Sequence, residues 1–168
     1  MGYVHDTHMS QFIPCTAMHY ATGTWSMTAG QVAGTIVKSK SAAGETTVIN
    51  VPIIVPSNAS ALKGSKVATI EFDYEIRTQA ATSITATLNK VTRNADGADA
   101  TVTSIPVTQD LTAGTDAADV DEHKLTVTVT TPTWIDNDDY YLLVITAVCA
   151  AGTLLDVLGA VANFTLRM

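Results

Sequence analysis

The chain has 168 residues, a net charge of −7, 46% hydrophobic residues and 15% charged residues. A chain of this length forms one domain that buries about 70% of the surface of its unfolded state, and with so few charges wholesale disorder is excluded. Nine basic residues against sixteen acidic ones do not provide the basic face that nucleic-acid binding requires, so we expect no nucleic-acid partner.

Residues 1–30 differ from the rest because their large apolar side chains do not alternate regularly with polar ones. We therefore predict an irregular N-terminal arm over residues 1–30 and a folded domain over residues 31–168. The polar start does not resemble a secretory signal peptide. The apolar side chains of the arm must be covered by the domain or by another subunit, and each large one contributes about 1.5–3 kcal/mol when buried. The predicted subunit or partner contacts are Tyr3, Phe12, Ile13, Met18 and Tyr20.

The arm also contains three of the four histidines and one of the two cysteines. Imidazole and thiolate groups are the ligands that zinc prefers, and the spacing of these residues suits a zinc site. Zinc knuckles, however, usually pair their cysteines closely, and here one sulfur ligand stands alone without a glycine-containing turn. We therefore expect no metal and no cofactor, and the candidate ligands, if zinc is bound, are His5, His8, Cys15 and His19.

From residue 32 onwards, apolar and polar residues alternate in short runs separated by turn residues, which is typical of β-strands. The clearest run is 70–77, where apolar residues occupy one face and every charge occupies the other. Residues 94–97 (NADG) predict a turn into a strand that begins near Thr101. Further strands with the same pattern are predicted at 49–55, 84–88 and 125–130.

The last two predicted strands, 140–148 and 154–166, are apolar on both faces, which is typical of strands that are covered on both sides. Gly159 inside the last strand predicts a bulge or a close approach of backbone. The region 140–158 is interrupted by polar and glycine residues, so no membrane span is expected.

These elements add up to eight or nine strands, with residues 57–65 as the only predicted helical turn. Loops of ordinary length join them, and no internal repeat is present. The predicted fold is all-β: a single antiparallel β-sandwich of jelly-roll type with an irregular N-terminal arm.

Two loops, at 115–122 and 136–139, are rich in carboxylates. Loops at one end of a sandwich can bring such groups together around calcium, but neither has the spacing of a helix-loop-helix calcium site, so we expect solvated loops. His123 follows Asp121 and Glu122, but adjacent residues of a strand point to opposite faces, and no nucleophile motif is present. We therefore predict no enzymatic activity.

Four aromatic residues offer possible stacking platforms for a sugar: Trp25, Trp134, Tyr140 and Tyr141. The competing interpretation is that Trp134 closes one end of the core. A secreted or surface carbohydrate-binding module therefore remains an alternative function.

Five segments together resemble the structural proteins of tailed phages and of uncultured viruses. They are residues 2–6 (GYVHD), 52–58 (PIIVPSN), 62–66 (LKGSK), 134–141 (WIDNDDYY) and the closing strand 159–166. In such families, β-sandwiches decorate capsids, form head fibres or cap tails, often as trimers. The resemblance implies a similar role for this chain and carries over no functional residue.

The leading hypothesis is a non-enzymatic viral structural protein, a trimeric capsid decoration protein on the outside of a virion. Its partners would be other copies of itself and a major capsid or other virion protein. Strands that are apolar on both faces suit burial at such an interface. Besides the carbohydrate-binding module, a self-assembling filament or layer subunit, whose arm donates a strand to the next chain, is a second alternative.

Overall fold

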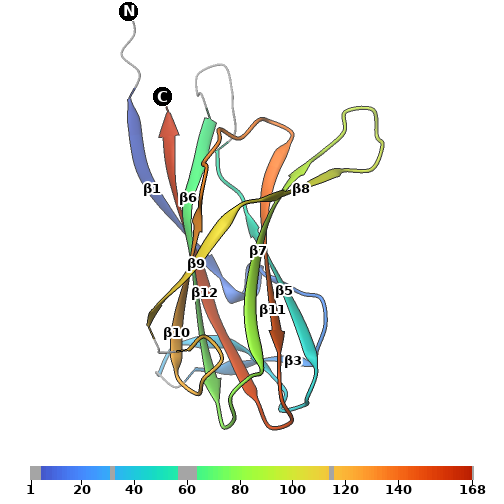
Figure 1. The fold of residues 1–168 in the computed structure, drawn as a ribbon, viewed down its shortest axis with the longest axis vertical. Helices are drawn as coiled ribbons and strands as arrows, with labels where there is room; N and C mark the ends of the chain where they lie inside the picture. Colours follow the sequence, from blue (N-terminus) through green and yellow to red (C-terminus); the bar gives the residue numbers. More distant parts are fainter. Residues whose placement is uncertain (1–4, 31–32, 57–63, 114–115, 168) are drawn as a thin grey trace, which may run out of the picture.

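The computed structural model of the chain describes residues 5–30, 33–56, 64–113 and 116–167. Within these ranges the protein consists of twelve β-strands and one short 3₁₀ turn. The strands form two antiparallel sheets that pack face to face (Figure 1). The predicted all-β sandwich of jelly-roll type is therefore confirmed.

The larger sheet has seven strands, and six of them lie side by side in one row. In spatial order these are β3 (Trp25–Ala29), β4 (Ile36–Lys40), β12 (Leu154–Arg167), β6 (Gly64–Arg77), β10 (Glu122–Val129) and β9 (Val107–Ala113). The seventh strand, β1 (Asp6–Pro14), also pairs with β12. The smaller sheet has the order β2 (His19–Tyr20), β5 (Thr46–Ile53), β11 (Asp139–Val148), β7 (Ser83–Thr92) and β8 (Thr101–Ile105).

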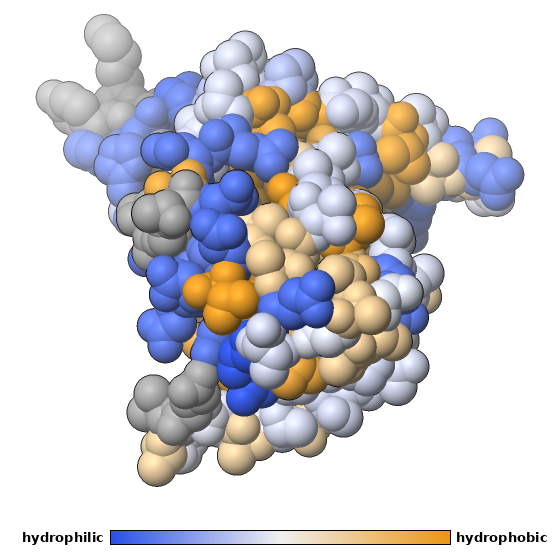
Figure 2. Space-filling view, turned by 60° about the horizontal axis from the view of Figure 1, so that its bottom comes forward, coloured by the Kyte–Doolittle hydropathy of each residue, from blue (hydrophilic) through white to orange (hydrophobic). Residues whose placement is uncertain are grey.

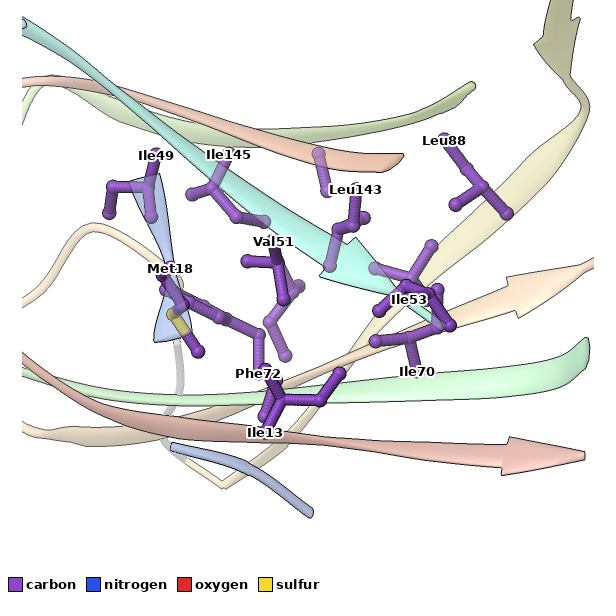
Figure 3. Packing of buried hydrophobic residues seen from close by; sticks show 14 of the residues in the cluster. Ile13, Met18, Ile49, Val51, Ile53, Ile70, Phe72, Leu88, Leu143 and Ile145 are labelled. Atoms are coloured by element: carbon purple, nitrogen blue, oxygen red, sulfur yellow. The ribbon is translucent and has the colours of Figure 1, made fainter. Parts of the chain in front are cut away.

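The core lies between the two sheets. On β6, the alternate residues Ile70 and Phe72 are almost fully buried, as the alternation in 70–77 predicts. From the opposite sheet, β11 contributes Leu143 and Ile145 to the same cluster (Figure 3). The inner faces of both sheets therefore share one apolar core.

The N-terminal arm is more regular than predicted, and this part of the prediction is corrected. β1 pairs with β12 over nine residues, from Asp6 opposite Arg167 to Pro14 opposite Gly159. β2 and β3 extend the two sheets in the same way. Only Ile13 of β1 is buried. A strand exposed on both faces needs no alternation of apolar and polar residues, so the sequence of β1 lacks the alternation by which strands are predicted.

β12 pairs with β6 along one edge, and its other edge is divided between β4 and β1. β4 pairs with residues 155–157 and β1 with residues 159–167, so Leu158 lies between the two partners. The register with β6 shifts at this point, which confirms the predicted bulge. A Cβ atom on Gly159 would lie 3.1 Å from the backbone oxygen of Ile13 and 2.8 Å from the ring of Phe12, so the predicted close approach of backbone is confirmed as well.

The smaller sheet has an open margin that a side chain closes. β8 pairs with β7 only from Leu88 to Thr92. Nearer the start of β7, the side chain of Gln109, which belongs to β9 of the other sheet, bonds the backbone of Ala86. Its amide accepts a hydrogen bond from the N–H group (3.0 Å) and donates one to the C=O group (2.8 Å). An amide side chain thus occupies the place of a neighbouring strand.

The predicted local features have mixed outcomes. The turn at 94–97 is present, its glycine has a φ of 80°, and β8 begins at Thr101 as predicted. The helical turn predicted at 57–65 falls mostly outside the described residues, and its last two positions already belong to β6. Among the described residues, no helix is long and apolar enough to cross a membrane.

Candidate functional site

The four zinc candidates do not come together. His5 and His8 are exposed at the start of β1, and the strand places about 20 Å between His8 and Cys15. Cys15 is buried and its thiol contacts the backbone C=O of Ile36. His19 lies exposed in the smaller sheet. Over the described parts of the chain, no group of three or more His, Cys, Asp or Glu side chains is placed to hold a metal ion.

The structure separates the five predicted contact residues. Phe12 is 62% exposed and Tyr20 is half-buried. Ile13 and Met18 belong to the core of their own chain, which corrects the prediction for these two, because their side chains are not available to another subunit. Ile13 is the buried residue near the end of β1, and Met18 follows η1 (Cys15–Ala17), whose Cys15 is buried as well. Tyr3 lies outside the described residues.

Exposed Phe12 forms one wall of a groove on the larger sheet, at the point where β1 ends and β4 begins. The bulge in β12 leaves Leu158 41% exposed in the gap between these two strands. On the face shown in Figure 2, hydrophobic residues reach the surface in patches separated by hydrophilic ones. The groove has a volume of about 360 Å³, and we call it the Phe12 groove; it is lined by Phe12, Thr35, Ile36, Val37, Asp73, Leu158 and Gly159.

Among the described residues, Asp73 is the only acidic one that lines the Phe12 groove. It lies on β6 opposite Gly159 on one side and opposite Lys124 on the other. Burial raises the pKa of its carboxyl group, although Lys124 acts in the opposite direction. The ammonium group of Lys124 bonds Glu71 instead, at 3.2 Å. The groove therefore combines apolar walls with a partly buried carboxylate.

A second groove lies nearby on the larger sheet and has a different chemistry. It has a volume of about 430 Å³ and is lined mainly by hydroxyl side chains together with an indole and a guanidinium group. We call it the hydroxyl groove; its lining is Thr24, Trp25, Ser26, Thr28, Ala29, Ser39, Lys40, Ser41, Arg77 and Leu154.

A chain of polar contacts crosses the hydroxyl groove. The hydroxyl oxygens of Thr28 and Ser39 are 2.9 Å apart, and Ser39 donates a hydrogen bond to the buried carboxylate of Asp156. Arg77 forms an ion pair with the same carboxylate at 2.5 Å. The Nε atom of Arg77 is buried and has no hydrogen-bond partner among the described residues. The groove therefore offers several hydroxyl groups, beside a buried donor that has no partner among the described residues.

The four candidate aromatic platforms are dispersed. Trp25 donates a hydrogen bond to Thr22 at 2.8 Å, and its ring lies 4.5 Å from the ring of Tyr20. Tyr141 is buried, whereas Tyr140 is 41% exposed. Trp25 alone among the four candidates lines the hydroxyl groove.

Trp134 is engaged with two cations at the end of the sandwich where the chain terminates. The guanidinium carbon of Arg167 lies 4.3 Å from the centre of the indole ring, and the ammonium nitrogen of Lys66 lies 4.8 Å from it. Arg167 also forms two hydrogen bonds to Asp6, at 2.7 and 3.0 Å. These bonds hold the pKa of the Asp6 carboxyl below its usual value.

The two acidic loops lie at opposite ends of β10, one just before the strand and one after it. They therefore form no joint calcium site. Asp139 is instead used structurally, with bonds to Thr92 (2.5 Å) and Lys90 (3.2 Å).

His123 is buried, and its Nε2 atom lies 2.8 Å from the backbone oxygen of Asp119.

The residues that make the Phe12 groove were mostly absent from the sequence prediction. Phe12 was predicted as a contact and Gly159 as a bulge, but Ile36, Asp73 and Leu158 were not singled out. The available signal was Leu158 next to Gly159, because a glycine bulge pushes the adjacent side chain outwards.

No protein-family model matches the chain, and no curated protein matches it. The solved structures that resemble it include the CBM22-1–GH10 modules of the Clostridium thermocellum xylanase 10B, in complex with xylohexaose. That structure is 8% identical with a TM-score of 0.45, and the match covers 92% of this chain and 27% of that one. The arabinose-bound α-L-arabinofuranosidase MgGH51 is 11% identical with a TM-score of 0.40, and the match covers 91% of this chain and 24% of that one.

Proposed function

We propose that this β-sandwich is a non-enzymatic viral structural protein that assembles into trimers on the outside of a virion. The partners in this proposal are other copies of the chain and a major capsid or other virion protein. Two lines of reasoning support the proposal. One is the resemblance of five sequence segments to phage structural proteins, and the other is the apolar surface around the Phe12 groove.

The observation that carries the proposal is the exposure of large apolar side chains around one groove. Phe12, Ile36 and Leu158 are 62%, 63% and 41% exposed and line the same groove. Exposed apolar side chains that cluster around a groove are typical of surfaces that bind another protein. In such an assembly the sandwich is a rigid block, and binding at the groove removes these side chains from water.

The test is the mass of the native protein, measured by light scattering and native mass spectrometry. We expect a trimer for the natural chain and dissociation for Ile36→Ser. The matched control is Ile54→Ser, since Ile54 is 68% exposed but does not line the Phe12 groove. A natural chain that stays monomeric at every concentration contradicts the proposal. Open polymers in electron micrographs would instead favour the filament alternative.

The hydroxyl groove favours one second candidate, the carbohydrate-binding module. Hydroxyl groups, a half-buried indole and a guanidinium group at one groove are the groups that hydrogen-bond and stack with sugars. The test is a glycan array with the natural chain and with Trp25→Ala. Binding that is lost in Trp25→Ala and kept in Tyr140→Ala, which changes an exposed ring away from the groove, supports this candidate. An array without a hit argues against it.

A further inference from the structure

The Phe12 groove contains a carboxylate, that of Asp73, to which no other group of the described residues forms a hydrogen bond or an ion pair. The neighbouring Lys124 acts on Asp73 through its charge, but the ammonium group itself bonds Glu71. The other walls of the groove are almost entirely apolar. A basic side chain fits such a groove well, since its carbon stem contacts the apolar walls while its cation reaches the carboxylate. The ring of Phe12 adds an aromatic face for the cation.

Among the described basic side chains that form an ion pair, Arg93 is the most exposed and its pair is the longest. Its side chain is 78% exposed, and its one ion pair, with Asp138, is 3.7 Å long. An exposed pair of this kind contributes little. The remaining described basic side chains either approach a carboxylate within 3.6 Å or lie over an aromatic ring: Lys38, Lys40, Lys66, Arg77, Lys90, Lys124 and Arg167.

Arg93 lies at the base of the hairpin that joins β7 and β8. This hairpin projects away from the body of the sandwich (Figure 1). On its second strand, Val102 pairs with Val91 and is 61% exposed. The hairpin therefore presents a cation and an apolar side chain, whereas the groove presents a carboxylate and apolar walls. The hairpin belongs to the smaller sheet and the groove to the larger one, so each chain carries both halves of a complementary pair on different surfaces.

We propose that the Phe12 groove of one copy binds Arg93 of the next copy, with the guanidinium group against the Asp73 carboxylate. This inference rests on the proposed trimer and supplies the contact that holds it together. Two different patches make a heterologous interface, and such an interface closes into a ring of three when a threefold rotation relates the copies. The pairing joins opposite charges, so it permits a chain of net charge −7 to bind itself.

The experiment is a charge exchange followed by the mass of the native protein as a function of concentration. Asp73→Arg and Arg93→Asp each place two like charges in the contact and are expected to raise the concentration of half-dissociation about tenfold or more. The double variant restores opposite charges and is expected to recover the trimer. Asp110→Asn, which removes a carboxylate of the larger sheet away from the groove, serves as the control and is expected to assemble normally. Circular dichroism establishes that each variant is folded.

The outcomes separate this inference from the proposed function. If the natural chain forms trimers and both single variants still do, the contact is wrong while the proposed function stands. A folded double variant that remains monomeric also overturns the contact. If the natural chain itself is monomeric, both proposals fail. If each single variant loses the trimer and the double variant recovers it, the pairing of Asp73 with Arg93 of the next copy is established.

Discussion

β1 and β12 are antiparallel partners along nine residue pairs, yet they differ in nearly every other respect. Most side chains of β12 are buried, including Phe164 and Leu166 at its end. Eight of the nine side chains of β1 are exposed. Backbone pairing therefore positions β1, but it does not make the strand part of the core. The comparison teaches that a strand can be paired with a neighbour along its whole length and still be available as a surface.

The energetic difference follows from burial. A net hydrogen bond contributes about 0.5–1.5 kcal/mol, whereas burying one large apolar side chain contributes about 1.5–3 kcal/mol. β12 is stabilised by the burial of its side chains and by hydrogen bonds to strands on both of its edges, β6 among them. β1 is stabilised mainly by its hydrogen bonds to β12 and by the burial of Ile13. We therefore expect β1 to open more easily than the rest of the larger sheet.

Replacing one phenylalanine in each strand tests this difference most directly. Phe164→Ala removes a buried ring of β12 and is expected to lower the free energy of unfolding by about 3–5 kcal/mol. Phe12→Ala removes an exposed ring of β1 and is expected to cost about 0.5 kcal/mol or less. Urea unfolding of both variants at a concentration where the chain is monomeric measures the two values. Losses of equal size would show that β1 is part of the core.

The next effect concerns the point where the two strands touch most closely. In Gly159→Ala, the new Cβ atom meets the ring of Phe12 at 2.8 Å and the backbone oxygen of Ile13 at 3.1 Å. We expect a loss of about 1–3 kcal/mol, because the bulge cannot accept the methyl group without a shift of β1. Adding Phe12→Ala in the same chain removes the ring and is expected to recover part of the loss in urea unfolding. No recovery would mean that the backbone contact alone sets the cost.

The smallest effect concerns the free end of β1, where Arg167 bonds Asp6. Asp6 has its pKa lowered from the ordinary value of 3.8, chiefly by this hydrogen bond. The pair therefore stabilises the folded state above that value, and its contribution is lost as the pH falls through the lowered pKa. We expect Asp6→Asn to speed amide hydrogen exchange in β1 at neutral pH, and the two proteins to become alike in acid. A difference that persists in acid would assign the effect to something other than the charge.

The strands β5, β6, β7, β10, β11 and β12 contain the runs from which they were predicted. The run at 70–77 places its apolar residues in the core because both sheets need an inner face, and alternation reports that need directly. β1 could not be found in this way, because its position depends on the edge of β12, which is 140 or more residues away in the chain. Local patterns do not report such pairing.

The candidate site was predictable only in part, for a related reason. The alternation of 70–77 places Asp73 on the outer face of β6, but it does not show that a bulge in β12 and the ring of Phe12 surround it. The burial of the carboxyl group, which raises its pKa, arises from residues of three strands. In the same way, Cys15 and His19 are close in sequence but diverge, because η1 and β2 carry them to different surroundings.

The Gln109 side chain has a consequence for how the molecule avoids uncontrolled aggregation. Unpaired strand margins recruit further strands, and proteins commonly guard them. By bonding both backbone groups of Ala86, this amide occupies the docking points that an incoming chain would use on β7. A strand from another molecule therefore cannot pair with β7 at Ala86, and the strand that remains at this edge of the smaller sheet is the short β8.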